Sequence, residues 1–226
     1  MTIRLALFGD SIAAGVGATS RTDALAARLS EELVREGHEV AARVFAVSGA
    51  RSADLGGQVD TALTWRPHVA VVVIGANDLI HRTRATRAAH DLAEAVRRLR
   101  DAGAEVVVAP APDLSALPYV PGSMVPLVRS ASMLLRDSQI VAAKGAGAHV
   151  ADCDHRTSTV FAADPSMFSS DQFHPSSAGY AVIAEALFPA VADAANRWME
   201  RRAATPAAAC TGARIAARLR ETTSVS

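Results

Sequence analysis

The chain alternates short, almost uninterrupted apolar runs with longer stretches that carry one apolar face, and this rhythm constrains its fold more than any other feature. Three of the short runs consist almost entirely of Val, Ile and Ala, which is typical of strands buried on both faces of a parallel sheet. Strands that alternate with helices in this way form right-handed βαβ units. We therefore predict an α/β fold with a five-stranded parallel sheet, whose strands are residues 3–9, 43–47, 69–75, 105–110 and 149–154.

The stretches between these runs have apolar residues three or four positions apart, the spacing of a helix face. The first three stretches end near Gly37, Gly103 and Gly145, and glycine is a common helix stop. The last contains Pro189, which we expect to bend or restart the helix because proline lacks the N–H group. The predicted buried faces are Leu25, Leu29 and Leu33; Ala89, Leu92, Val96 and Leu99; Val128, Ala131, Leu134 and Leu135; and Tyr180, Ile183, Leu187 and Val191.

Polar residues and glycines stand directly after the predicted strands. Ser11 follows the first strand, Gly49 the second and Asn77 the third, while Asp171 and His174 follow the fifth after a loop. Because ligands bind at the carboxyl ends of parallel strands, we expect these residues to share one edge of the sheet. A hydroxyl, an imidazole, a carboxylate and N–H donors are the groups that nucleophilic acyl transfer requires.

The spacing of Asp171 and His174 suits a turn. Pro175 disfavours the helical conformation at His174, so the residues before it are expected to be extended or turned. A turn lets the Asp171 carboxylate reach one imidazole nitrogen while the other points at Ser11. The carboxylate would then fix the tautomer and stabilise the imidazolium ion that forms during attack.

Four sequence blocks carry a family resemblance. Each follows a predicted strand, and their order along the chain is FGDSIAAGVG, VSGARSADL, VIGANDL and SDQFHPSSAGY. Together they resemble the conserved blocks of the SGNH hydrolases, also called GDSL esterases and lipases. The resemblance implies a flavodoxin-like three-layer α/β/α sandwich. It also implies a serine esterase, a carboxylic ester hydrolase that works through an acyl-enzyme without a cofactor on a small-molecule ester.

The resemblance also implies a role for each of the five residues. Ser11 would be the nucleophile, His174 the base and Asp171 the partner that orients the base. The oxyanion hole would consist of the backbone N–H groups of Ser11 and Gly49 and the side-chain amide of Asn77. The sequence departs from the motif name only in having isoleucine after Ser11 where the name has leucine, and that side chain is expected to face packing.

A proline-rich loop, residues 111–126, is longer than most strand-to-helix connections, and loops of this length are often functional. Apolar residues in this loop and after Asn77 are predicted to line an acyl pocket, or else to seat the loop on the core. The first interpretation favours short- to medium-chain acyl esters, with acetyl esters such as O-acetylated sugars as the alternative. The residues are Leu79, Ile80, Leu114, Leu117, Tyr119 and Val120.

Each site residue also has a purely structural interpretation. A serine after Gly-Asp is common in turns, Gly49 suits a positive φ, Asn77 can begin a helix and His174 can be a surface histidine. A chain with these roles would be a non-catalytic ligand-binding domain on the same fold. A further alternative is an acyltransferase that uses an alcohol acceptor. The joint occurrence of all five groups favours the esterase.

Composition argues against several other functions. Lys plus Arg and Asp plus Glu balance at 23 each, so no net charge favours nucleic acid as a partner. The sequence has no G-x-G-x-x-G, GK[ST] or G-x-S-x-G motif, which argues against nucleotide-binding loops and the α/β-hydrolase fold. Asp152, Cys153, Asp154 and His155 are clustered, but neighbouring strand residues point to opposite faces, so we expect no metal.

The chain has the length of one domain with a sizeable core. We expect this domain to span residues 1–202 and residues 203–226 to form an appended tail, disordered or with a short helix. No run approaches the roughly 20 apolar residues of a membrane span. The apolar stretch at the start is too short for a signal peptide, so a cytoplasmic location is expected, and the oligomeric state stays open.

Overall fold

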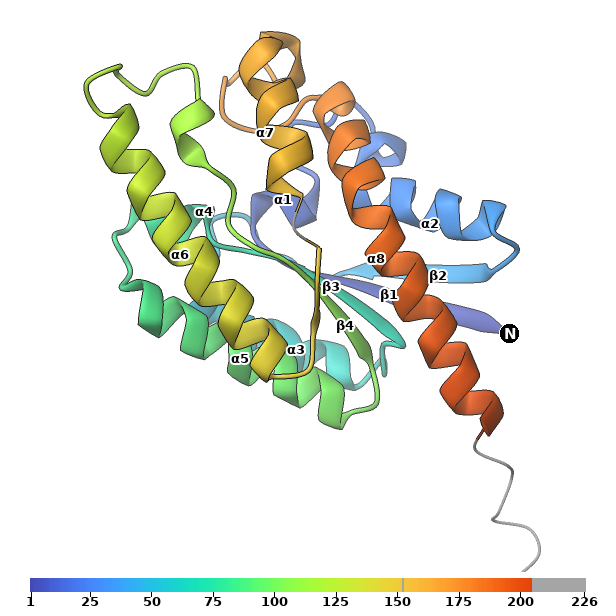
Figure 1. The fold of residues 1–226 in the computed structure, drawn as a ribbon. Helices are drawn as coiled ribbons and strands as arrows, with labels where there is room; N and C mark the ends of the chain where they lie inside the picture. The colour runs from blue at the N-terminus through green and yellow to red at the C-terminus, as the bar shows by residue number, and fades with distance from the viewer. Residues whose placement is uncertain (152, 205–226) are drawn as a thin grey trace, which may run out of the picture.

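The structure, a computed structural model, describes residues 1–151 and 153–204. Its centre is a five-stranded sheet in which every neighbouring pair is parallel, in the order β2-β1-β3-β4-β5 (Figure 1). The predicted α/β fold with a five-stranded parallel sheet is therefore confirmed. The strands are β1 (Thr2–Gly9), β2 (Glu39–Val44), β3 (Val69–Val73), β4 (Glu105–Ala109) and β5 (His149–Val150).

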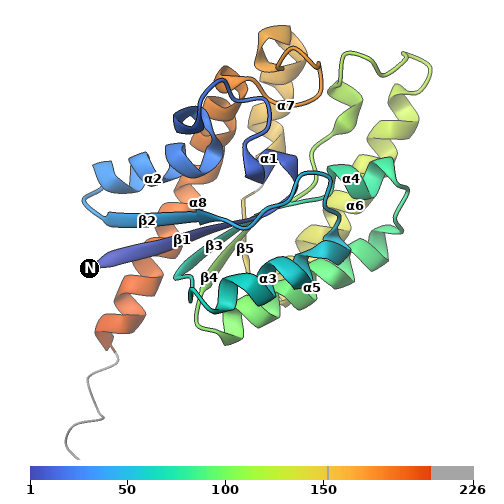
Figure 2. The same ribbon diagram turned by 180° about the vertical axis from the view of Figure 1, so that it is seen from behind.

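Helices cover both faces of the sheet and complete a three-layer sandwich. Successive strand residues point to opposite faces, so each central strand contributes to two separate clusters of buried side chains. On one face lie α2 (Leu25–Arg35) and α8 (Ser177–Ala204) (Figures 1 and 2). On the other lie α3 (Leu55–Leu63), α5 (Ala85–Asp101) and α6 (Val125–Gly145).

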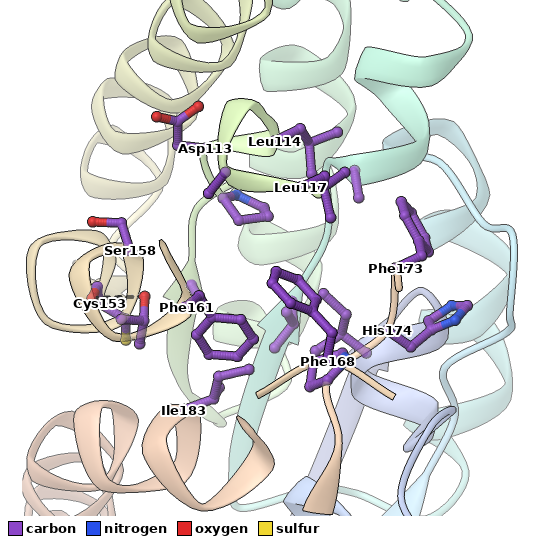
Figure 3. A pocket seen from close by; sticks show the side chains of 18 of the residues that line it. Asp113, Leu114, Leu117, Cys153, Ser158, Phe161, Phe168, Phe173, His174 and Ile183 are labelled. Carbon is purple, nitrogen blue, oxygen red and sulfur yellow. Dashed lines mark hydrogen bonds between the residues drawn. The ribbon is translucent and has the colours of Figure 1, made fainter. Parts of the chain in front are cut away.

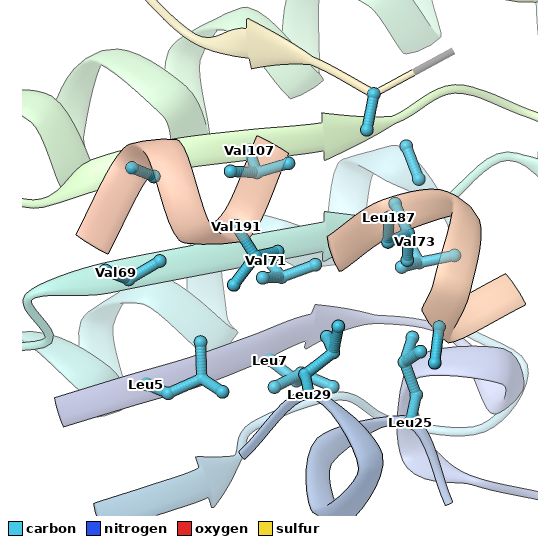
Figure 4. Packing of buried hydrophobic residues seen from close by; sticks show 14 of the residues in the cluster. Leu5, Leu7, Leu25, Leu29, Val69, Val71, Val73, Val107, Leu187 and Val191 are labelled. Carbon is cyan, nitrogen blue, oxygen red and sulfur yellow. The ribbon is translucent and has the colours of Figure 1, made fainter. Parts of the chain in front are cut away.

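Figure 4 shows the first of these clusters, in which leucine and valine side chains of α2 and α8 pack on the strands. Burial of each such side chain stabilises the fold by about 1.5–3 kcal/mol before entropy is counted. By length and composition α8 could span a membrane. In this fold, however, it serves as a core helix, because Tyr180, Leu187, Val191 and Trp198 are buried.

Both edge strands differ from their predicted ranges. The strand predicted at 43–47 begins earlier, at Glu39, and ends at Val44. All of its residues are exposed or half-buried, because an edge strand packs on fewer neighbours. An apolar run in the sequence therefore does not mark the limits of this strand. At the other edge β5 is only two residues long and does not extend over 149–154.

The buried face of α6 was predicted correctly only in part, since Leu135 is buried as expected and Val128 is half-buried. Ala131 is exposed and Leu134 is 63% exposed. The positions turned inward are Ser132, Leu135, Gln139 and Ala143. Gln139 is fully buried because its side chain accepts a hydrogen bond from the Ala111 N–H (2.7 Å) and donates one to the Ile74 carbonyl (3.2 Å). Backbone groups just after β3 and β4 thus require a polar partner at this position.

Two further predictions concern the end of the chain. Helix α8 continues through Pro189 and does not restart there. It runs to Ala204 and so passes the domain boundary predicted at residue 202. The predicted tail, apart from its first two residues, lies outside the described part of the chain.

Shorter elements lie beyond the carboxyl ends of the strands, on the side where Figure 1 shows α1, α4 and α7. They occupy the connections that leave each strand, including the proline-rich loop 111–126. These elements are α1 (Ser11–Ala14), α4 (Ala76–Ile80), α7 (Asp154–Ala163) and the 3₁₀ turns η1 (Arg21–Asp23), η2 (Ser52–Asp54), η3 (Leu114–Ala116) and η4 (Pro165–Met167).

Candidate active site

Ser11 is the first residue of α1, immediately after β1. The chain can turn there because Gly9 has a φ of +127° and lacks a side chain. A Cβ at Gly9 would lie 1.7 Å from the Val73 carbonyl oxygen of β3. The side chain of Gln58 holds the turn by pairing with both the N–H and the carbonyl of Gly9, each at 2.8 Å. Ser11 is therefore carried on a rigid turn at the edge of the sheet.

Asp10 caps the short helix that begins at Ser11. Its side chain accepts a hydrogen bond from the Ile12 N–H at 3.0 Å. Burial raises the pKa of Asp10 to about 6, against the opposing effects of the Ile12 hydrogen bond and of the charge on His174. The negative charge beside Ser11 and His174 therefore changes with pH in the mildly acidic range.

His174 and Asp171 form the predicted turn. His174 Nδ1 lies 2.6 Å from Asp171 Oδ2, while Asp171 Oδ1 accepts the N–H groups of Phe173 and His174 (both 2.9 Å) and the Ser169 hydroxyl (2.8 Å). These hydrogen bonds, above all the one to His174, hold the pKa of Asp171 far below its usual range. An ionised Asp171 places the proton on Nδ1, so Nε2 of a neutral His174 is the nitrogen that can accept a proton.

Ser11 and His174 line the same cavity (Figure 3). These two residues, which are far apart in the sequence, are thus brought to one cavity, and this placement is compatible with the predicted contact between them. Within the described part of the chain the Ser11 hydroxyl makes no hydrogen bond. Catalytic hydrogen bonds are often loose in a free enzyme and tighten when substrate binds.

Each of the three predicted oxyanion donors has an N–H group to which no residue in the described part of the chain is hydrogen-bonded. No hydrogen bond between described residues uses the backbone N–H of Ser11 or of Gly49. Gly49 has a φ of +84°, a conformation that favours glycine. Asn77 Nδ2 donates one N–H to the Ala50 carbonyl at 3.1 Å, which leaves its second N–H available. This hydrogen bond also fixes the Asn77 side chain beside the loop that carries Gly49.

Asp78, the residue after Asn77, supports this part of the site. It is fully buried, and its Oδ2 accepts hydrogen bonds from the N–H (2.9 Å) and the hydroxyl (2.8 Å) of Ser52. Together with the contact between Asn77 and Ala50, this pair fastens α4 to the loop after β2. Nothing in the sequence indicated the contact between Asp78 and Ser52, because the two residues are 26 positions apart.

Of the predicted pocket residues, Leu114 and Leu117 line the cavity and the others do not. Leu79 instead packs between two small apolar clusters under the loop. Ile80 is 52% exposed at the end of α4, and Tyr119 is 56% exposed with its ring stacked on Phe173. Val120 packs in one of those clusters, so the loop is partly seated on the core.

Sequence reasoning missed several apolar residues of the cavity wall. Phe161 of α7 packs edge-to-face on Phe168, with ring centroids 5.1 Å apart. In Figure 3 His174 lies on one side of this pair, and Cys153 and Ser158 lie on the other. The residues missed include Ile12, Phe161, Phe168, Phe173 and Ile183.

The described residues contain no group of three or more His, Cys, Asp or Glu side chains that could hold a metal ion. Of the cluster considered in the sequence, only Cys153 has a described side chain. It lines the cavity and donates a hydrogen bond to the Ala151 carbonyl at 3.4 Å.

Comparison with known proteins shows the family to which the chain belongs. The model of the GDSL-like lipase/acylhydrolase family matches residues 7–182. The chain therefore belongs to that family, as the four sequence blocks indicated.

Individual relatives agree with this assignment. A GDSL-like esterase of Mycobacterium tuberculosis is 36% identical over 196 residues, which are 85% of this chain. The alignment covers 62% of that esterase, so the chain spans about three fifths of its length. Among solved structures, TesA has a TM-score of 0.68 at 21% identity and covers 83% of this chain and 97% of its own. A variant of Axe2, an acetyl xylan esterase from Geobacillus stearothermophilus, has a TM-score of 0.67 at 17% identity, with coverages of 84% and 94%. These two likenesses concern the fold.

Proposed function

We propose that the protein is a serine esterase that hydrolyses carboxylic esters through an acyl-enzyme on Ser11. The observation that carries this proposal is that Ser11 and His174 line one cavity, with the imidazole held by Asp171 at 2.6 Å. Membership in the GDSL-like lipase/acylhydrolase family supports it.

The reaction follows from these groups in two halves. His174 Nε2 takes the proton of the Ser11 hydroxyl as Oγ attacks the ester carbonyl, and the imidazolium is stabilised by Asp171. The oxyanion accepts hydrogen bonds from the N–H groups of Ser11, Gly49 and Asn77. The intermediate collapses as the imidazolium gives its proton to the leaving alcohol. Water then attacks the acyl-enzyme by the same proton transfers and releases the acid and free Ser11.

The cavity walls favour a short- to medium-chain acyl group over a larger polar one. Aromatic and aliphatic side chains from α1, η3, α7 and α8 surround the space beside Ser11, and burial of each methylene of an acyl chain contributes about 0.8 kcal/mol. Acetyl esters are the second candidate substrate, and the resemblance in fold to an acetyl xylan esterase supports that alternative.

A series of p-nitrophenyl esters tests both the activity and the substrate class. We expect kcat/KM to rise from acetate through butyrate to hexanoate, by up to about fourfold for each methylene. Phe161→Ala is expected to move the optimum to longer chains, because it removes a side chain from the cavity wall. Phe188→Ala, at a half-buried position outside the cavity wall, is the matched control and should leave the optimum in place.

Three outcomes would change this assignment. A maximum at acetate with a sharp fall by butyrate would select the acetylesterase. No hydrolysis of any ester in the series would favour a ligand-binding domain. Ester products formed in the presence of a competing alcohol would instead identify acyl transfer.

A further inference from the structure

The segment Gly15–Thr19, which follows the helix of Ser11, lies against the segment that carries His174. Val16 makes the connection at one point: its N–H donates to the Ser11 carbonyl at 2.9 Å, and its own carbonyl accepts the Tyr180 hydroxyl at 2.7 Å. Tyr180 is fully buried in α8, six residues after His174. One residue therefore joins the backbone of the proposed nucleophile to the helix that follows the proposed base.

Gly17 sets how closely the two segments approach. Its φ is +94°, and a Cβ at this position would lie 2.4 Å from the Pro175 carbonyl oxygen and 2.9 Å from His174 Cβ. Real Cβ atoms essentially never approach other atoms so closely. Neither of those atoms can rotate away, because one belongs to the backbone and the other is bonded to it. A side chain at Gly17 therefore forces residues 15–19 and the segment that carries His174 apart.

Thr19, at the end of this segment, is hydrogen-bonded to Ser177 at the start of α8. The Thr19 N–H donates to Ser177 Oγ at 3.0 Å, and the two hydroxyl oxygens lie 2.7 Å apart. Neither these two residues nor Val16, Gly17 or Tyr180 lines the cavity. The contact thus acts on the site through residues that line it, namely Ser11, His174 and Pro175.

We propose that Gly15–Thr19 is a spacer that sets the separation of the Ser11 hydroxyl from the His174 imidazole, with Gly17 and Tyr180 as positioning residues. The proposal rests on the proposed esterase function. A misplacement of about 1 Å can cost a hundredfold in rate even when the altered residue does not touch substrate. Since the apolar wall around the acyl group is built mainly by other elements, the loss falls on kcat and not on KM.

The test compares Gly17→Ala with Gly37→Ala. Gly37 has nearly the same φ, +91°, but a Cβ there meets no atom within 4 Å. Both variants therefore strain the backbone alike, and only the first pushes on His174. For p-nitrophenyl butyrate we expect Gly17→Ala to lower kcat about a hundredfold with little change in KM. Gly37→Ala should keep the wild-type kcat although its Tm falls. A wild-type kcat in Gly17→Ala, equal losses in both variants or a loss confined to KM would overturn the proposal.

Tyr180→Phe keeps the test decisive if Gly17→Ala does not fold. It preserves the buried ring and removes only the hydrogen bond to Val16, so kcat should fall severalfold at unchanged KM. An unchanged kcat would overturn the proposal. Labelling of the wild-type protein with a fluorophosphonate, which reacts with an activated serine, separates failure of the esterase proposal from failure of the spacer proposal. An unlabelled wild type counts against the esterase itself, whereas an active wild type with a fully active Gly17→Ala counts against the spacer alone.

Discussion

Replacing His174 with alanine is expected to lower kcat by roughly four to six orders of magnitude, with KM little changed. Without the imidazole no group takes the Ser11 proton, and the residual rate comes from substrate binding and the oxyanion donors. Steady-state kinetics on a p-nitrophenyl ester measure both parameters. If the variant keeps a rate within about tenfold of wild type, His174 is not a base of this kind but a surface histidine.

Asp171→Asn is the matched variant for this prediction. It keeps the size of the side chain but removes the charge that stabilises the imidazolium and selects the tautomer. We expect a smaller loss than for His174→Ala, because Asp171 is 47% exposed and water replaces part of its effect. Activity should also change as the pH falls through about 6, because Asp10, whose pKa is raised to about 6 by burial, then takes up a proton and loses its charge. Asp10→Asn should remove this part of the pH dependence.

The second large effect is expected at Asn77, where alanine should lower kcat by about a hundred- to a thousandfold. The amide N–H not bonded to Ala50 is proposed to stabilise the oxyanion, which exists only in the transition state and the intermediate. KM should therefore change little. Asn77→Asp, similar in size but without a donor, should be at least as impaired.

Loss of the loop anchor must be separated from loss of the donor, because Asn77 also holds Ala50. Ser52→Ala removes the hydroxyl contact between the same loop and Asp78 but no oxyanion donor. Its loss in kcat should be much smaller than that of Asn77→Ala. A loss confined to KM in Asn77→Ala would show that Asn77 only binds substrate.

The central strands could be predicted because burial on both faces leaves an apolar run in the sequence, as in β3 and β4. The limits of the edge strands could not be predicted in the same way, because β2 is exposed enough to carry Glu39 and Arg43. The inner face of α6 was missed in part for a different reason. Gln139 faces inward to satisfy the Ala111 N–H and the Ile74 carbonyl, and a count of hydrophobic residues cannot register that demand.

The candidate site was more predictable than the pocket beside it. Ser11, Gly49 and Asn77 follow parallel strands, whose carboxyl ends meet at one edge whatever the details of packing. The wall containing Phe161 and Phe168 depends on α7 and η4, which carry no strong apolar periodicity and follow a strand only two residues long. Their positions come from tertiary packing.

The most direct test of the account is the intact mass of the protein after reaction with a fluorophosphonate, followed by mapping of the modified residue. We expect one adduct for each wild-type chain, located on Ser11, and no adduct in Ser11→Ala under the same conditions. Equal modification of both proteins, a wild-type adduct on another residue, or no adduct in either protein would contradict the proposed nucleophile.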